Sequence, residues 1–266
     1  IILHLEYMDT KRFPSADYKN NWKKYLFEKY RSFKHELIMV ADDNALNLLL
    51  EIRSEFAPGI PIVFCGINYY DKERFDTHED ITGVIESYDL SGTLDLISTF
   101  HPQMKKLYII NDLTATGEAN YKRLTDLYPN YRKKMTWQFL ENYSMDELCD
   151  YLQKIPADIP VLLMSFNKDR LGDAYDYTDS IAKISESCKN PMYGVWGFYL
   201  GRGIVGGSLT RGEDQGKKAA ELALRILHGE KAGKIPVVTE SPTQFGFDYE
   251  QMVRFRLPVK NLPPDS

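Results

Sequence analysis

Residues 192–207 read MYGVWGFYLGRGIVGG, a stretch in which large aromatic side chains stand beside closely spaced glycines. Its first half favours a strand, because tyrosine and valine are good strand formers. Its second half contains G-x-G-x-x-G from Gly201 to Gly206, which is the spacing of a dinucleotide-binding turn. That motif needs a helix directly after the turn, whereas here the next helical pattern begins only after Gly212. We therefore interpret residues 192–207 as a link between two lobes and as one wall of a ligand cleft.

Outward from this stretch, short apolar segments alternate with helical patterns along the chain. The segments expected to form strands are 1–5, 37–41, 62–65, 81–86, 107–110, 136–140, 161–164, 235–238 and 244–247. Helices are expected over 17–33, 45–56, 91–100, 117–128, 144–152 and 214–228. Residues 180–188 are expected to form the end of a further helix. Continuous apolar strands that alternate with helices are typical of a parallel sheet covered on both faces. The predicted fold class is therefore α/β, with two doubly wound parallel-sheet lobes, a hinge and an interlobe cleft.

The alternating units fall into two runs, and the late segments are interpreted as returns of the chain to each lobe. We expect lobe 1 to contain residues 1–92 and 203–236, and lobe 2 to contain residues 93–202 and 240–266. Local signals support several helix starts. Asp43 or Asn44 is expected to cap the helix that follows, and Ser91 the next one. Ser144 and Glu147 have the spacing of a capping box.

Composition and charge narrow the function classes. The chain has 266 residues, a formal net charge of −5 and 43% hydrophobic residues. This charge disfavours nucleic acids and membrane surfaces as partners, and the apolar content is sufficient for a core. Three cysteines without C-x-x-C spacing indicate no disulfide framework, and five scattered histidines indicate no metal site. We expect neither a metal nor a cofactor, and no apolar run approaches the ~18 residues of a membrane span.

Polar and aromatic side chains follow the expected strands at their carboxyl ends, which is where open parallel sheets bind ligands. The predicted ligand-binding residues are Asp42, Asp43, Asn44, Asn68, Tyr69, Asn111, Asp112, Thr114, Thr116, Phe166, Asn167, Trp196, Phe198 and Tyr199. Carboxylates and amides can fix a small polar ligand, and aromatic rings can stack on it. Simpler roles remain open, namely helix capping for residues 42–44, turn formation for 111–112, and packing or surface exposure for the aromatic side chains.

Motifs spread over nearly the whole chain resemble a known family. They are EYMDTKR (6–12), GIN (66–68), ITGVIE (81–86), YGVWGFYLGRGIVGG (193–207), GKKAAELALRILHGE (216–230), IPVV (235–238), FDYEQMVRF (247–255) and LPPDS (262–266). The chain resembles the ABC-transporter substrate-binding-protein-like domains that form extracytoplasmic sensor regions of bacterial membrane histidine kinases and related signalling proteins. The resemblance implies a type I periplasmic-binding-protein fold with ligand between the lobes and no catalysis. It also implies that the family's first strand–helix unit is missing here, and that the tail leads toward a membrane helix.

The resemblance implies an extracytoplasmic sensor domain, part of a membrane-anchored protein, that signals by lobe closure to a kinase or a similar output. The expected partner is a small molecule such as an amino acid or another polar or aromatic metabolite, and a homodimer is left open. One alternative is a solute-binding receptor of an ABC importer. Another is an α/β enzyme with a cleft carboxylate, although no G-x-S-x-G, P-loop or H-E-x-x-H motif supports it. A LacI-like repressor core would need a DNA-binding helix pair upstream.

Overall fold

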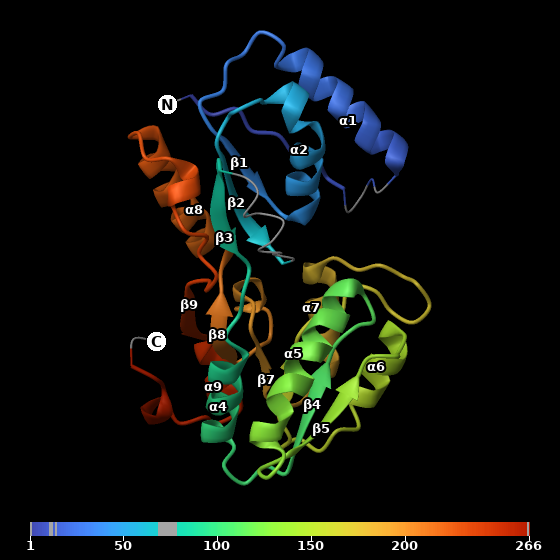
Figure 1. The fold of residues 1–266 in the computed structure, drawn as a ribbon. Helices are drawn as coiled ribbons and strands as arrows, with labels where there is room; N and C mark the ends of the chain where they lie inside the picture. The colour runs from blue at the N-terminus through green and yellow to red at the C-terminus, as the bar shows by residue number, and fades with distance from the viewer. Residues whose placement is uncertain (1, 11–12, 14, 69–78, 265) are drawn as a thin grey trace. The chain divides into compact units, whose positions relative to one another are not determined.

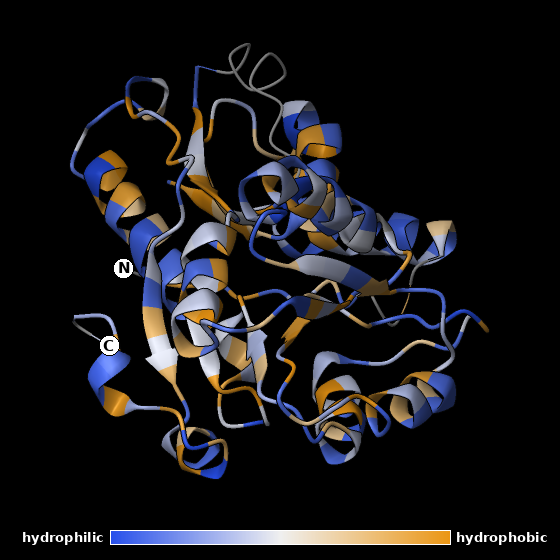
Figure 2. Cartoon of the chain, turned by 90° about the horizontal axis from the view of Figure 1, so that it is seen from below, coloured by the Kyte–Doolittle hydropathy of each residue, from blue (hydrophilic) through white to orange (hydrophobic). Residues whose placement is uncertain are grey.

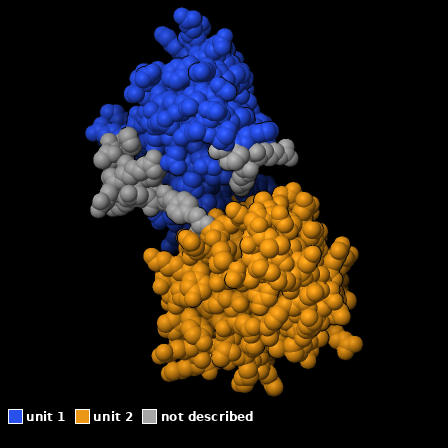
Figure 3. All heavy atoms as spheres, turned by 90° about the vertical axis from the view of Figure 1, so that its right-hand side faces the viewer, with its two compact units in different colours: residues 1–87, 212–241 blue, residues 88–211, 242–266 orange. Residues whose placement is uncertain are grey.

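The computed structural model describes residues 2–10, 13, 15–68, 79–264 and 266. The chain forms two compact units (Figures 1 and 3). Unit 1 contains residues 1–87 and 212–241, and unit 2 contains residues 88–211 and 242–266. Each unit holds a sheet of mainly parallel strands with helices packed on it, so the predicted α/β class is confirmed.

Unit 1 contains a parallel sheet in the order β1-β2-β3. Its strands are β1 (Ile38–Ala41), β2 (Ile62–Ile67) and β3 (Ile81–Ile85), and its helices are α1 (Ala16–Lys29), α2 (Asp43–Phe56), α8 (Gly212–Leu227) and the short η2 (Ala232–Lys234). Side chains of β2 alternate between the two faces, as the strand period requires. Phe64 therefore packs with Leu46 of α2, whereas Val63 packs with Leu222 of α8. Helix α1 covers α2.

Unit 2 contains a sheet in the order β5-β4-β6-β7-β8-β9, in which β9 alone runs antiparallel to its neighbour. Its strands are β4 (Lys106–Ile110), β5 (Thr136–Leu140), β6 (Val161–Leu163), β7 (Met192–Gly194), β8 (Gly206–Thr210) and β9 (Thr243–Phe247). Its helices are α4 (Leu90–Phe100), α5 (Ala115–Tyr131), α6 (Met145–Leu152), α7 (Tyr177–Ser187) and α9 (Tyr249–Arg254), with short turns η1 (Gly197–Tyr199) and η3 (Val259–Asn261). Helix α4 packs over β7 and β8, and α6 packs against α7.

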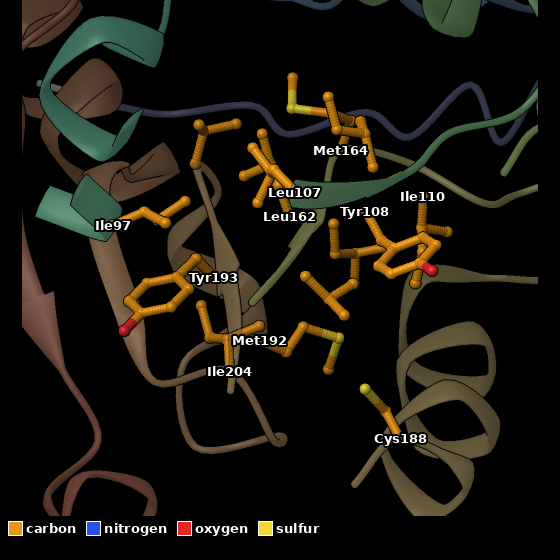
Figure 4. Packing of buried hydrophobic residues seen from close by; sticks show 14 of the residues in the cluster. Ile97, Leu107, Tyr108, Ile110, Leu162, Met164, Cys188, Met192, Tyr193 and Ile204 are labelled. Carbon is orange, nitrogen blue, oxygen red and sulfur yellow. The ribbon is translucent and has the colours of Figure 1, made fainter. Parts of the chain in front are cut away.

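One continuous apolar core fills unit 2. Ile97, Leu107, Leu162, Tyr193 and Ile204 lie in it and are all inaccessible to solvent (Figure 4). Each fully buried aliphatic side chain of this kind contributes roughly 1.5–3 kcal/mol to the free energy of unfolding. Hydrophobic and hydrophilic residues form stripes along the helices (Figure 2), as expected of helices that cover a sheet with one face. This core holds the strand ends of unit 2 in fixed positions.

The helix starts follow the sequence signals in part. Ser144 accepts a hydrogen bond from the Glu147 N–H and the Glu147 side chain accepts one from the Ser144 N–H, so the predicted capping box is confirmed. Helix α4 is capped by Asp89 and not by Ser91, because the Asp89 carboxylate accepts a hydrogen bond from the N–H of Gly92, the third residue of the helix. At α2 the capping position belongs to Asp42, whose side chain makes no capping hydrogen bond. The predictions for these two caps were wrong.

Two of the expected strands are not formed. Residues 2–5 pair with no strand among the described residues, and Ile2, Leu3 and Leu5 are 85%, 83% and 71% exposed. An apolar segment forms a strand only when a partner supplies its hydrogen bonds, and none of the described strands does so here. Residues 235–238 contribute a single bridge between Val238 and Val84 instead of a strand.

Residues 192–207 lie entirely in unit 2, where they form β7, η1 and the start of β8. Residues 203–211, which we expected in lobe 1, also belong to unit 2, since β8 pairs with β7 and β9. The chain passes from one unit to the other after residues 87, 211 and 241. Gly206 has a φ of 149°, and a Cβ there would lie 2.2 Å from the Gly246 carbonyl oxygen. The glycine therefore permits close strand pairing, and the interpretation of this stretch as a link between lobes was wrong.

A half-buried histidine makes the stability of unit 2 depend on pH. The His101 Nε2 atom lies 2.9 Å from the hydroxyl of Tyr193. Burial lowers the pKa of His101 to about 4, with Asp158 opposing the shift. Between pH 6.5 and 4 the unfolded chain therefore binds a proton that the folded chain does not, so stability is lost as the pH falls through this window.

We expect this loss to amount to about 2–3 kcal/mol for the wild type. His101→Gln keeps a hydrogen-bonding group that does not titrate, so its stability should fall much less between pH 6.5 and 4.5. Urea unfolding at several pH values measures the difference. Parallel pH curves for the two proteins would contradict the assignment.

Candidate functional site

The carboxylate of Asp112 connects the ends of two strands in unit 2. Asp112 follows β4 and is completely buried. Its Oδ1 atom accepts hydrogen bonds from the Thr114 N–H, at 3.1 Å, and from the Thr114 hydroxyl. Its Oδ2 atom accepts a hydrogen bond of 2.7 Å from the N–H of Asn167, which follows β6. The structure therefore brings together three predicted site residues, and no ion pair among the described residues includes Asp112.

Helix α5 begins directly after this contact. Thr114 is its N-cap and accepts a hydrogen bond of 3.2 Å from the N–H of Gly117. A Cβ at Gly117 would lie 1.9 Å from the carbonyl oxygen of Asp112, so glycine alone fits this position without a shift of the backbone. Thr116 is exposed on the first turn of the helix. The first turn of a helix presents N–H groups that favour an anionic ligand group.

Asn111 supports the start of α5 from inside the protein and does not face solvent. Its Nδ2 atom donates to the Gly117 carbonyl at 2.9 Å and to Glu141 at 3.0 Å. Its Oδ1 atom accepts from Asn120 at 3.3 Å and from the Ser165 hydroxyl at 3.4 Å. All these partners are intramolecular and Asn111 is completely buried, so in this structure Asn111 supports the start of α5, and its contact with ligand stays a prediction.

The same network continues to an aromatic pair. The Tyr88 hydroxyl donates to Asn120 Oδ1 at 2.7 Å, and the Tyr88 ring packs edge-to-face on Trp196 at 5.0 Å. The Trp196 indole N–H donates to the carbonyl of Met164 at 3.0 Å. Burial raises the pKa of Tyr88, opposed by the Arg123 guanidinium, which lies 4.6 Å from the ring centre. Sequence reasoning missed Tyr88, which lies three residues after β3, and Asn120, which lies within helix α5.

Phe198 is the exposed ring of a second aromatic group. It is 45% exposed, and its ring lies parallel to that of Trp196 with 6.0 Å between the centres. It also packs on Tyr177 at 4.5 Å and on Tyr199 at 4.6 Å. Tyr199 is only 1% exposed. Phe166 is completely buried within the core, and its contact with ligand stays a prediction.

Unit 1 places the remaining predicted residues at the ends of β1 and β2. Asp43 Oδ2 accepts a hydrogen bond of 3.1 Å from the N–H of Asn68. Asn44 donates to the Thr10 hydroxyl at 3.0 Å. Asp42 is exposed and has a φ of 78°, which is uncommon for a residue with a side chain. Tyr69 lies outside the described residues.

Other features of the described residues fall outside these two sets. Unit 1 has a hollow of about 390 Å³ on α1 and the segment before it, lined by Glu6, Tyr7, Tyr18, Asn21, Trp22 and Tyr25. It contains none of the predicted site residues. The described part of the chain has no group of three or more His, Cys, Asp or Glu side chains arranged to hold a metal ion. None of the described helices combines the length and apolarity needed to cross a membrane.

Residues 39–250 match the family described as ABC transporter substrate binding protein. The chain belongs to this family. A tyrosine-binding protein of Clostridioides difficile is 26% identical to it over 167 residues, which are 62% of this chain and 46% of that protein. The chain thus spans about half the length of this curated relative. The expected kinship to ABC-transporter substrate-binding proteins is confirmed at this level.

Solved structures support the same fold. A substrate binding protein with adhesive properties from Clostridium difficile, in its ligand-free, open form, has a TM-score of 0.68 at 16% identity, over 93% of this chain and 81% of that one. An ABC domain from Streptococcus pneumonia in complex with L-Trp has a TM-score of 0.61 at 14% identity, over 91% of this chain and 80% of that one. At these identities the likeness supports the fold alone, which is of the periplasmic-binding-protein type.

The close approach at Gly117 generates a stability prediction. Gly117→Ala forces the α5 start away from Asp112, and we expect a loss of about 1–3 kcal/mol in the free energy of unfolding. Gly216→Ala, inside helix α8, is the matched control, because a Cβ at Gly216 would have no neighbouring atom within 4 Å. The control should gain about 0.5–1 kcal/mol, since alanine is the better helix former. Urea unfolding of both variants tests the pair, and equal stabilities would contradict the packing described for Gly117.

Proposed function

We propose that the chain is an extracytoplasmic ligand-binding domain that binds an amino acid with an aromatic side chain. The observation that carries the proposal is the connected network of unit 2, in which Asp112, the start of α5 and the rings of Trp196 and Phe198 adjoin the strand ends. A zwitterion offers a charged group to polar atoms of this kind, and its ring offers a surface to aromatic side chains.

The relatives favour this ligand class. One curated relative is a tyrosine-binding protein, and one solved structure of similar fold holds L-Trp. In the proposal, Thr114, Thr116 and Asn167 hold the polar end of the ligand, and Trp196, Phe198 and Tyr199 hold its ring. Asp42, Asp43, Asn44 and Asn68 of unit 1 stay predicted ligand-binding residues, as does Tyr69.

The output of binding depends on the parent protein. We propose a sensor that signals to a membrane-linked kinase, which is supported by the resemblance of residues 247–255 and 262–266 to sensor tails. The second candidate is a receptor that delivers ligand to an ABC importer, and the family match favours it. The coding sequence on either side of this chain distinguishes the sensor from the importer receptor. A membrane helix and a kinase domain after residue 266 would support the sensor, and their absence would support the importer receptor.

Calorimetric titration tests the ligand class. We expect L-tyrosine or L-tryptophan to bind with a micromolar dissociation constant and D-glucose not to bind, because a sugar lacks both the charge and the aromatic ring. Asp112→Asn should weaken binding at least tenfold. Asp169→Asn is the matched control, since Asp169 is also buried and accepts N–H hydrogen bonds from Met145, Leu171 and Asp173, within a neighbouring loop.

The control should lose stability, because three buried N–H groups lose part of their charge-assisted hydrogen bonding, but it should keep its ligand affinity. Binding of glucose in preference to both amino acids would refute the proposed ligand class. Equal affinities for Asp112→Asn and the wild type would remove Asp112 from the site.

A further inference from the structure

Tyr88 is attached to helix α5 at two points that lie one turn apart. Its hydroxyl donates a hydrogen bond of 2.7 Å to the Oδ1 atom of Asn120, which is 2% exposed. The guanidinium of Arg123 lies 4.6 Å from the centre of the Tyr88 ring, which is the distance of a cation–π contact. Asn120 and Arg123 are three residues apart, so they lie on one face of the helix. The Tyr88 ring therefore has a defined place on α5.

The Tyr88 ring in turn fixes the indole of Trp196. The two rings meet edge to face, at an angle of 65° and with 5.0 Å between their centres. The indole N–H donates to the Met164 carbonyl at 3.0 Å. One hydrogen bond alone would let the indole pivot about it, and the Tyr88 ring blocks that movement. The orientation of Trp196 therefore depends on a side chain that is anchored on α5.

Helix α5 joins this aromatic group to the polar groups of the proposed site. Thr116 lies in its first turn, and Asn120 lies one turn later. The Nδ2 atom of Asn120 donates to Asn111 at 3.3 Å and to Ser165 at 3.2 Å, which follow β4 and β6. Four residues of a helix span about 6 Å along its axis, and the backbone hydrogen bonds keep this rise constant. The helix thus sets the distance from the polar groups to the Tyr88 ring.

Building on the proposed function, we propose that Tyr88 is a positioning residue that selects ligands by their length. Anchored on α5, it holds Trp196 at a fixed distance from the polar groups at the start of that helix. A ligand then fits only if the spacer between its charged end and its ring matches this distance. Tyr88 acts through Trp196 and needs no contact with the ligand. In an amino acid, the spacer is the set of methylene groups between the α-carbon and the ring.

Three amino acids that differ only in this spacer test the inference. In L-4-hydroxyphenylglycine the ring is bonded directly to the α-carbon, L-tyrosine has one methylene group between them, and L-homotyrosine has two. The wild type should bind L-tyrosine about tenfold more tightly than either of the others, which is the discrimination that one methylene group allows. Tyr88→Phe keeps the ring but loses the hydrogen bond to Asn120, so this preference should fall by about fivefold. Calorimetry measures the three dissociation constants.

Tyr131→Phe is the matched control. The Tyr131 hydroxyl also forms a hydrogen bond across α5, to Asp95 at 3.0 Å, but from the last residue of the helix. This variant should lower the melting temperature and leave the preference for L-tyrosine unchanged. Asn120→Ala removes the partner of the Tyr88 hydroxyl, so it should lower the preference as well. Adding Tyr88→Phe to Asn120→Ala should lower it no further, because the two residues act as one unit.

The outcomes separate this inference from the proposed function. An unchanged preference in Tyr88→Phe, whether or not all three ligands bind more weakly, would overturn the inference alone. The same holds for a wild type that binds L-tryptophan but does not prefer L-tyrosine within the series. A wild type that binds neither L-tyrosine nor L-tryptophan would overturn the proposed function and this inference with it.

Discussion

The carboxylate of Asp112 is the constraint on which the strand-end edge of unit 2 depends. It is completely buried, and its hydrogen bonds join the end of β4, the end of β6 and the first turn of α5. Hydrogen bonds to a charged acceptor are stronger than neutral ones, and the positive end of a helix stabilises a carboxylate placed before it. Breaking this contact would leave a buried charge unsatisfied, which is far more costly than losing an exposed hydrogen bond. Gly117 is required because α5 must start in contact with the Asp112 backbone.

In unit 1 a neutral side chain joins segments that are distant from one another in the sequence. Gln215, in the first turn of α8, accepts a hydrogen bond of 3.0 Å from the N–H of Gly66 and donates one of 2.8 Å to the Ser241 hydroxyl. Ser241 in turn forms hydrogen bonds with Ser87 and with the carbonyl of Ile85. These contacts connect the end of β2, the end of β3 and the returning chain. They fix the strand ends of unit 1 close to the points where the chain leaves and re-enters it.

The sequence predicted the periodic elements well, because short apolar runs and amphipathic helices are local patterns. It also predicted the capping box of Ser144 and Glu147 and located Asp112, Thr114 and Asn167 at strand ends. What it missed depends on contacts between distant segments. Leu3 and its neighbours have strand-like sequence but no partner among the described strands, and Gly206 serves the approach of Gly246 and not a hinge. Burial likewise cannot be deduced locally, so the sequence did not show that Asn111 and Phe166 are completely buried.

The central claim is that the ligand is held at the start of α5 in unit 2. Hydrogen–deuterium exchange of the wild type, with and without saturating L-tyrosine, measures it directly. The account predicts slower exchange in peptides that cover residues 111–120 and 165–170, because ligand would shield the first turn of α5 and stabilise its contact with Asn167. Peptides from α1 should exchange at the same rate in both states. Unchanged exchange at residues 111–120 in a protein that calorimetry shows to be saturated, or protection confined to α1, would contradict the account.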